Sequence, residues 1–313
     1  MKKKARIVPL LLTLTMLISA CSSIVSPGSK SISLTDGMER EVNLSAPAQR
    51  IVSLAPSNTE ILFALEAADQ VVGKDEFSNY PAEVTSIPSI GGSMGNYNFE
   101  NIAALKPDLV LASSLNTPEQ VKSLEELGIT VYLLPNPVNL DGLYKNLGTV
   151  GTLIGKTSQA DKLIEDLKSR VSAVEDKISA VDNKPVAFYE LDASDAAQPW
   201  TSGPGTFLSN LIGMAGGMNA GDELSGDFGQ ISLETLLMKN PDLIILGDSN
   251  YGVEIQQVAS RPGWETLGAV KSSRVYPFND DLVSRPGPRL VDGLEALARL
   301  IHPEALINKI HNL

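Results

Sequence analysis

Histidine and cysteine are nearly absent from this sequence of 313 residues, which contains two histidines and one cysteine. The histidines, His302 and His311, lie near the C-terminus, so the body of the chain has none for a Ser-His-Asp hydrolase site. A zinc, copper or haem site built from His and Cys is excluded for the same reason, and one cysteine cannot form an internal disulfide bond. We therefore expect no metal, no cofactor and no catalysis; an exported hydrolase that uses two carboxylates is a remote alternative.

Positive charge is also scarce. The chain has 25 Lys and Arg against 37 Asp and Glu, which gives a formal net charge of -12. Four of the basic residues fall within the first six positions, so the remainder is more acidic still. Such a surface repels phosphate backbones, and we expect no nucleic-acid partner. It suits instead a partner with basic patches.

The sequence lacks an apolar run long enough to span a bilayer, which takes about 20 residues. The run from Ile7 to Ala20 is shorter, follows a basic cluster and ends in small residues, as secretory signals do. Ile18-Ser19-Ala20-Cys21 has the pattern of a lipobox, in which the cysteine becomes the lipid-carrying first residue. We predict a signal peptide (1–20), lipidation of Cys21, and a location outside the cytoplasmic membrane, either periplasm or cell surface.

Short apolar runs alternate with amphipathic stretches along the rest of the chain, which predicts α/β organisation with parallel strands. From Thr157 to Val181, apolar residues recur at intervals of three and four, so one long helix divides the body into two halves. The predicted fold is two Rossmann-like lobes joined by a single long α-helix, with a largely pre-formed ligand cleft between the lobes. The predicted parts are a Ser-rich flexible tether (21–45, with room for a short hairpin at Asp36-Gly37), an N-terminal lobe (46–156), a connecting helix (157–182) and a C-terminal lobe (183–313).

Two short patterns bear on this division. Glu100, six residues and Pro107-Asp108-Leu109 are mirrored by Glu234, six residues and Pro241-Asp242-Leu243, which indicates a repeat between the halves. Any two helix-to-strand turns could share such residues by chance. Gly151-x3-Gly155-Lys156-Thr157 resembles a phosphate-binding loop but has three residues between the glycines instead of four, so we interpret it as the junction of two helices.

An ordered set of motifs resembles the helical-backbone, or class III, periplasmic binding proteins, which deliver siderophores, haem or corrinoids to ABC importers. The resemblance covers about residues 46–303. It rests on the segment Arg50–Glu60, Tyr80-Pro81, Asn98-Phe99-Glu100 with Lys106–Leu109, the long helix, and Thr201-Ser202-Gly203. Within this class the chain looks most like the vitamin B12-binding branch, through the segment Gly73–Pro81 and the spacing Asp281-x3-Arg285.

The resemblance implies a set of ligand contacts in the cleft: Phe77, Met94, Tyr97, Trp200, Asp281, Leu282, Val283, Ser284 and Arg285. Flat apolar side chains suit the faces of a corrin, and polar groups suit its rim amides. Core packing is the alternative for each aromatic residue, and pairing with a carboxylate is the alternative for Arg285. The loop at Met94 and Tyr97 departs from the B12 branch, which places a tryptophan there, and this puts the preferred corrinoid in doubt.

The resemblance also gives Glu100 and Glu234 a role, since one glutamate on each lobe docks on arginines of the importer. Their alternative role is favourable interaction with a helix dipole. The implied function is that of a monomeric lipoprotein that captures cobalamin or another corrinoid and delivers it to the permease and ATPase of an ABC importer. A ferric-siderophore or haem carrier of the same fold is the alternative, with Tyr80 or Tyr97 as the iron ligand.

Overall fold

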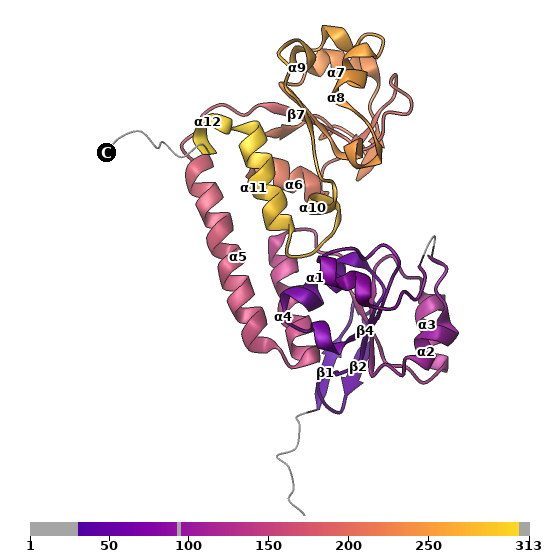
Figure 1. Ribbon diagram of the computed structural model, residues 1–313. Coiled ribbons are helices and arrows are strands. Elements are labelled where there is room, and N and C mark those ends of the chain that lie inside the picture. Colours follow the sequence, from indigo (N-terminus) through magenta and orange to yellow (C-terminus); the bar gives the residue numbers. More distant parts are fainter. Residues whose placement is uncertain (1–30, 93–94, 307–313) are drawn as a thin grey trace, which may run out of the picture.

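The computed structural model describes residues 31–92 and 95–306, which form two α/β lobes bridged by the long helix α5 (Thr157–Ile178) (Figure 1). The N-terminal lobe contains β1 (Ile32–Thr35), β2 (Glu41–Leu44), β3 (Ile51–Ser53), α1 (Pro56–Ala64), β4 (Val71–Lys74), α2 (Phe99–Ala104), β5 (Leu109–Ser113), α3 (Pro118–Glu126), β6 (Val131–Leu134) and α4 (Leu140–Ile154). The C-terminal lobe contains β7 (Val186–Glu190), β8 (Trp200–Ser202), α6 (Phe207–Met214), β9 (Met218–Asn219), β10 (Phe228–Gln230), α7 (Leu233–Lys239), β11 (Leu243–Leu246), α8 (Ile255–Ser260), α9 (Gly268–Lys271), β12 (Val275–Pro277), α10 (Asp281–Ser284), α11 (Leu290–Ile301) and α12 (Pro303–Leu306).

The two lobes share one sheet topology. The N-terminal sheet has the order β4-β3-β5-β6 and the C-terminal sheet the order β9-β7-β11-β12, with every pair of neighbours parallel. In each lobe the first strand along the chain therefore lies between the second and the third. The predicted α/β fold with parallel sheets is confirmed, and the lobes are repeats of one another at the level of topology.

The repeated Pro-Asp-Leu turn has the same structural task in both lobes. The carboxylate of Asp108 accepts hydrogen bonds from the backbone N–H groups of Gln49 (2.8 Å) and Arg50 (2.9 Å), next to the start of β3. The carboxylate of Asp242 accepts one from the N–H of Val186 (2.7 Å), at the start of β7. Each aspartate thus ties the entry of the third strand to that of the first, which accounts for the matching interval in the sequence.

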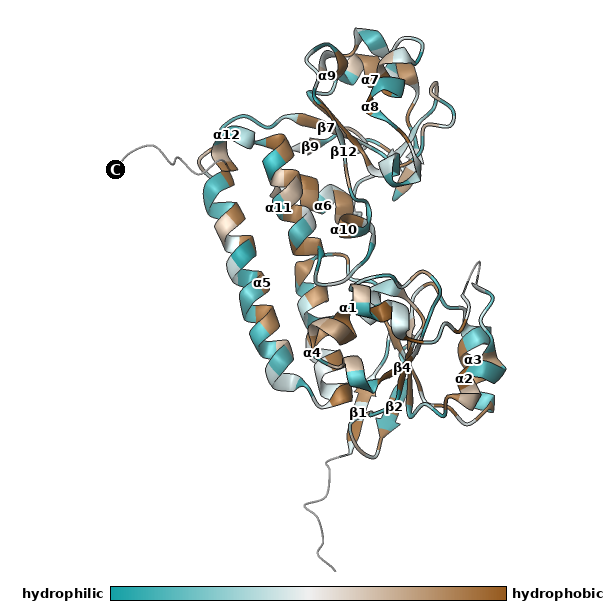
Figure 2. Ribbon diagram, in the orientation of Figure 1, coloured by the Kyte–Doolittle hydropathy of each residue, from teal (hydrophilic) through white to brown (hydrophobic). Residues whose placement is uncertain are grey.

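One hydrophobic core runs through both lobes. Because side chains alternate across a strand, each sheet has two faces. The faces turned toward α5 join a single cluster, which includes Ile51 and Leu109 in one lobe and Tyr189 and Ile245 in the other. The outer faces form two separate clusters, one under α2 and α3 and one under α7 and α8. The lobes therefore share a core along α5 rather than meeting as independent units, as the apolar residues of both sheets illustrate (Figure 2).

The glycines of the apparent phosphate-binding loop have structural roles. Gly155 ends α4 in the left-handed conformation (φ 74°), and α5 starts two residues later. A Cβ on Gly151 would lie 2.6 Å from the Cβ of Ala160, so the close packing of α4 against α5 requires glycine there. The interpretation of this segment as a junction of two helices is confirmed. Helix α5 begins at the predicted residue, ends four residues before the predicted 182, and measures about 33 Å.

The predicted tether is wrong from Ile32 onward. Strands β1 and β2 form an antiparallel hairpin, and Ile32, Val42 and Leu44 are buried in the core of the N-terminal lobe. The turn is held by Asp36, whose carboxylate accepts hydrogen bonds from the backbone and side chain of Arg40. The folded body therefore begins at β1 rather than at residue 46. The short hairpin considered at Asp36-Gly37 is present, but it is part of the N-terminal lobe rather than of a tether.

A buried cluster of ionic side chains links the lobes. Glu60 on α1 is 3% exposed, and its carboxylate binds two arginines from the segment between α10 and α11. Arg289 donates to both carboxylate oxygens, with its Nε at 2.8 Å, and Arg285 donates from Nη1 at 3.2 Å. The guanidinium of Arg289 also lies over the ring of Tyr80, 4.0 Å from its centroid. We call Glu60, Arg285 and Arg289 the interlobe clamp.

Removing the first hairpin is expected to destabilise the fold. A chain that begins at residue 46 loses three buried apolar side chains and the Asp36–Arg40 pair, and it should unfold with a free energy about 3–5 kcal/mol lower than a chain that begins at residue 31. Urea unfolding followed by circular dichroism measures this difference. Equal midpoints for the two chains would show that the hairpin does not support the core.

Glu60→Gln is expected to lower the free energy of unfolding by about 3–5 kcal/mol, because it leaves the buried Arg289 without a counter-ion and the partly buried Arg285 with Asp281 alone. Glu126→Gln is a matched control, since Glu126 pairs only with Lys122 on an exposed helix face and should change stability by less than about 0.5 kcal/mol. Denaturant unfolding of both variants checks the prediction. An unchanged stability in Glu60→Gln would contradict it.

Candidate binding cleft

The carboxyl ends of the parallel strands of both lobes border the space between them, which is where open α/β sheets bind ligands. Large apolar side chains are exposed on loops that follow these strands. In the N-terminal lobe, Phe77 follows β4, Leu115 follows β5 and Val138 follows β6; they are 54%, 80% and 65% exposed. In the C-terminal lobe, Trp200, Phe228 and Tyr251 are exposed beyond β7 and β11. Both edges of the cleft therefore offer apolar surface.

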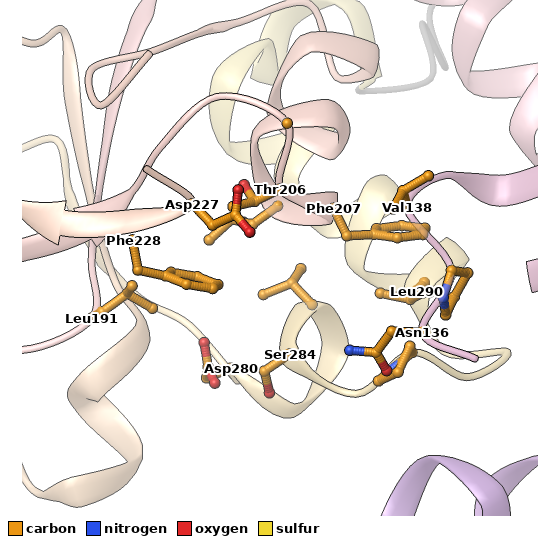
Figure 3. Close-up of a pocket in the computed structure, with 15 residues that line it drawn as sticks. Asn136, Val138, Leu191, Thr206, Phe207, Asp227, Phe228, Asp280, Ser284 and Leu290 are labelled. Carbon is orange, nitrogen blue, oxygen red and sulfur yellow. The ribbon is translucent and has the colours of Figure 1, made fainter. Parts of the chain in front are cut away.

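The cleft contains a pocket of about 320 Å³ with walls from both lobes. The loop after β6 contributes Asn136 and Val138, and the C-terminal lobe contributes most of the remaining lining. Figure 3 shows the rings of Phe207 and Phe228 on opposite sides of the pocket, with Asp280 and Ser284 along one edge. The lining thus combines aromatic surface with oxygen-bearing side chains.

Two aromatic residues of the cleft stand on a small β-ribbon. Strands β8 and β10 pair antiparallel, with Trp200 opposite Gln230 and Phe228 opposite Ser202. This register puts Trp200 and Phe228 diagonally on the same face. The ribbon needs glycine after β8, because a Cβ on Gly203 would lie 1.9 Å from the carbonyl oxygen of Gly226. The Thr201-Ser202-Gly203 motif is therefore a requirement of the ribbon that presents these rings.

Part of the predicted contact set lies at the cleft. Val283 and Ser284 line the pocket, and Phe77 and Trp200 are exposed on opposite lobes. Tyr97 is half-buried, packs against the N-terminal core, and donates a hydrogen bond from its hydroxyl to the carbonyl oxygen of Leu54 (3.0 Å). Leu282 is half-buried and packs against the shared core. Met94 lies outside the described residues.

The structure gives Arg285 and Asp281 a different immediate partner from the one predicted. Arg285 is bound to Glu60 in the clamp, to Asp281 (2.9 Å) and to the side-chain oxygen of Asn79 (2.7 Å). Its donors are directed at protein carboxylates and an amide, as in the alternative of pairing with a carboxylate. The pair with Asp281 is a local contact between residues four apart, whereas the pair with Glu60 could not be found from spacing, because Glu60 lies 225 residues away in the chain.

The basic and acidic side chains near the cleft differ in whether they are already paired within the protein. The described residues that line the pocket include no lysine or arginine. Arg285 and Arg289, in the segment that follows Ser284, are bound to the buried Glu60, and Arg261, in a separate hollow of the C-terminal lobe, is bound to the buried Glu190. Acidic side chains are less constrained. Asp227 and Asp280 line the pocket, and Asp280 accepts a hydrogen bond from the hydroxyl of Tyr189 (2.8 Å).

The Tyr189 hydroxyl remains a donor, because burial and the negative charge of Asp280 raise the pKa of Tyr189 well above its usual range. The described lining of the pocket therefore presents oxygen acceptors and negative charge, and it includes no lysine or arginine.

Several cleft residues were missed by sequence analysis, among them Leu115, Val138, Phe207, Phe228 and Tyr251. Their sequence signal is a large apolar residue in a short polar segment that follows a predicted strand, as in Gly226-Asp227-Phe228-Gly229. Such residues are common on surfaces and are informative only when several converge. Their convergence depends on how the lobes are placed, which the tertiary structure alone provides.

Glu100 and Glu234 occupy corresponding places in the two lobes. Each is exposed in the first turn of a helix, α2 or α7, that precedes the third strand of its sheet. Both helices cover the face of their sheet remote from α5 (Figure 1). Cys21 lies outside the described residues. Among the residues that the structure describes, no helix is both long and apolar enough to cross a membrane, and no group of His, Cys, Asp or Glu could hold a metal ion.

Comparison with known proteins agrees with this architecture. The family model described as periplasmic binding protein matches residues 51–282. An uncharacterized ABC transporter substrate-binding lipoprotein of Bacillus subtilis is 33% identical over 97% of this chain and 99% of its own length.

Two solved structures have the same fold. The periplasmic vitamin B12-binding protein of Vibrio cholerae is 27% identical over 82% of this chain and 98% of its own, with a TM-score of 0.68. An apo haem-binding periplasmic protein of Roseiflexus is 26% identical over 82% of this chain and 99% of its own, with a TM-score of 0.73. These relatives are substrate-binding proteins of transport rather than enzymes, and the chain belongs to the periplasmic binding protein family.

Proposed function

We propose that this protein captures a corrinoid in the cleft between its lobes and delivers it to an ABC importer. The observation that carries the proposal is the composition of the pocket, whose described lining combines aromatic side chains with Asp227 and Asp280 and includes no lysine or arginine. A corrin is a broad ring with an apolar face and a rim of neutral amides, which can donate hydrogen bonds to such carboxylates. The Vibrio cholerae B12-binding relative supports the same substrate class.

Anionic ligands fit this cleft less well. Haem propionates and anionic ferric chelates call for unpaired cations, whereas Arg261, Arg285 and Arg289 are each committed to a carboxylate. The tyrosines considered as iron ligands are also engaged, because the ring of Tyr80 lies under Arg289 and the hydroxyl of Tyr97 is bonded to backbone. Haem or siderophore binding is therefore the second candidate. The haem-binding Roseiflexus relative favours it, and the pairing of the arginines with protein carboxylates disfavours it.

The remainder of the proposal concerns delivery. Lipid on Cys21 would hold the protein, as a monomer, at the outer face of the membrane. The residues between Cys21 and the first strand would connect the lipid to the folded lobes and so let the lobes reach the importer. Tethering raises the effective concentration of the carrier at its permease. Glu100 and Glu234, at equivalent places on the two lobes, would give a two-point electrostatic contact with arginines of the permease, while the ATPase lies on the far side of the membrane.

Cyanocobalamin should bind the purified protein, and Phe228→Ala should weaken that binding about 10- to 100-fold, because the ring supplies apolar surface to the ligand. Met238→Ala is the matched control, since Met238 is also exposed but lies on α7, away from the cleft. Isothermal titration calorimetry measures both. Absence of cyanocobalamin binding at tens of micromolar, together with tight binding of haemin, would replace the corrinoid with the second candidate.

Charge reversal at either docking residue, Glu100→Lys or Glu234→Lys, should lower corrinoid uptake by cells about tenfold and leave the affinity of the purified protein unchanged. Glu119→Lys serves as control, because Glu119 is another exposed first-turn glutamate, on α3. Uptake of radiolabelled cobalamin and calorimetry provide the two readouts. Normal uptake by both charge-reversal variants would show that Glu100 and Glu234 do not dock on the permease.

A further inference from the structure

The N-terminal lobe contributes one short loop to the pocket in the cleft. Among the described residues that line this pocket, those of the N-terminal lobe are Asn136, Pro137 and Val138, and the rest belong to the C-terminal lobe. The three residues lie between β6 and α4. We call residues 135–138 the pocket loop. The shape of the pocket therefore depends on where the pocket loop lies relative to the C-terminal lobe.

The beginning of the pocket loop is fixed within its own lobe. The side-chain amide of Asn146 on α4 donates a hydrogen bond to the carbonyl oxygen of Pro135 (2.8 Å). The backbone N–H of Asn136 donates to the hydroxyl oxygen of Ser114, beyond β5 (2.9 Å). Pro135 and Pro137 also restrict the backbone, because the proline ring fixes φ. These contacts leave the end of the loop, at Val138, to be positioned by something else.

The end of the pocket loop is bonded to the C-terminal lobe. The side-chain amide of Asn210 donates a hydrogen bond to the carbonyl oxygen of Val138 (2.9 Å), across 72 residues of chain. Asn210 lies on α6, three residues after Phe207, so the two share a face of the helix. Figure 3 shows Phe207 and Val138 at the same end of the pocket. Leu208 and Leu211 anchor α6 in the shared core. One fixed helix thus supplies a ring of the pocket and the donor that holds the facing loop.

We propose that Asn210 is a positioning residue of the binding pocket, which holds the pocket loop, and with it the side chain of Val138, in place for the ligand. Asn210 itself is exposed and is not part of the pocket lining, so its effect on the ligand passes through the loop. Without this hydrogen bond, ligand binding would have to order the end of the loop, and that ordering opposes binding. The inference rests on the proposed function, in that the ligand occupies this pocket.

Two substitutions remove the donor in different ways. Asn210→Asp keeps the shape of the side chain but turns a carboxylate oxygen toward the carbonyl of Val138, and Asn210→Ala removes the amide. Both should weaken cyanocobalamin binding about 3- to 10-fold in calorimetry, the effect of one hydrogen bond. Asn101→Asp is the charge-matched control, because Asn101 is also an exposed helical asparagine but lies on α2, and it should leave the affinity unchanged. Weaker binding in Asn210→Asp alone would indicate an effect of charge and would overturn the proposal.

A double-mutant cycle tests whether Asn210 acts through the pocket loop. Val138→Ala should itself weaken cyanocobalamin binding, because the side chain lines the pocket. Adding Asn210→Ala to Val138→Ala should then cost less affinity than Asn210→Ala costs in the wild-type protein, since residues that act together are not additive. Thermal unfolding checks that each variant is folded. Fully additive losses of affinity would show that Asn210 acts independently of Val138 and would count against the proposal.

Hydrogen exchange of the ligand-free protein separates this inference from the proposed function. Peptides that span the pocket loop should exchange faster in Asn210→Ala than in the wild-type protein or Asn101→Asp, because the end of the loop is released. Faster exchange and weaker haemin binding in Asn210→Ala, with no cyanocobalamin binding by the wild type, would support the positioning role and reject the corrinoid. Equal exchange, with cyanocobalamin bound equally by wild type and Asn210→Ala, would keep the corrinoid and reject the positioning role.

Discussion

The contact between Glu60 and its two arginines determines how the lobes are placed, and the geometry of the cleft depends on it. A glutamate that is almost fully buried is unfavourable unless its charge is balanced and its oxygens are hydrogen-bonded. In the N-terminal lobe alone, Glu60 on α1 would lack this balance; Arg285 and Arg289 of the other lobe supply it. Such a pair contributes more to the definition of one arrangement than to net stability, because two apolar residues could pack as well.

The shared core, like the interlobe clamp, keeps the two lobes close together. The faces of both sheets that turn toward α5 belong to one apolar cluster, and α11 packs beside α5 within it (Figure 1). A wide separation of the lobes would expose apolar surface and leave Glu60 and the arginines unpaired. We therefore expect the cleft to be largely pre-formed, with small adjustments when a ligand binds.

The clamp also affects selectivity. Arginines that are bound to protein carboxylates cannot neutralise an anionic ligand without breaking a buried pair. The cleft keeps its aromatic side chains and its acceptors, which include Asp227 and Asp280. An uncharged ring bordered by amides meets these groups without displacing an ion pair. The interaction that positions the lobes thus narrows the class of ligand that fits between them.

Local patterns in the sequence were sufficient for the architecture. The period of three and four residues predicts α5, Gly155 marks the end of α4, and the equal spacing from Glu100 and Glu234 predicts a repeat that the sheets confirm. Each of these features depends on residues close together in the chain. A short hairpin at Asp36-Gly37 was considered, but it was assigned to the tether, because strands of four residues in a serine-rich segment do not show that they pack into a lobe.

The binding site was predicted in part, because its components are brought together from distant parts of the chain. Val283 and Ser284 were located through a motif, but Phe228 and Val138 come to line one pocket only when both sheets are aligned along α5. Arg285 shows the limit most clearly, since its spacing suggested a ligand contact and its partner lies 225 residues away. The sequence by itself determined the two lobes and the connecting helix, because these follow from short-range periodicity and spacing, and an ordered set of motifs carried the resemblance to the family. The tertiary structure decided which charges remain free for a ligand, because that depends on ion pairs between residues far apart in the chain.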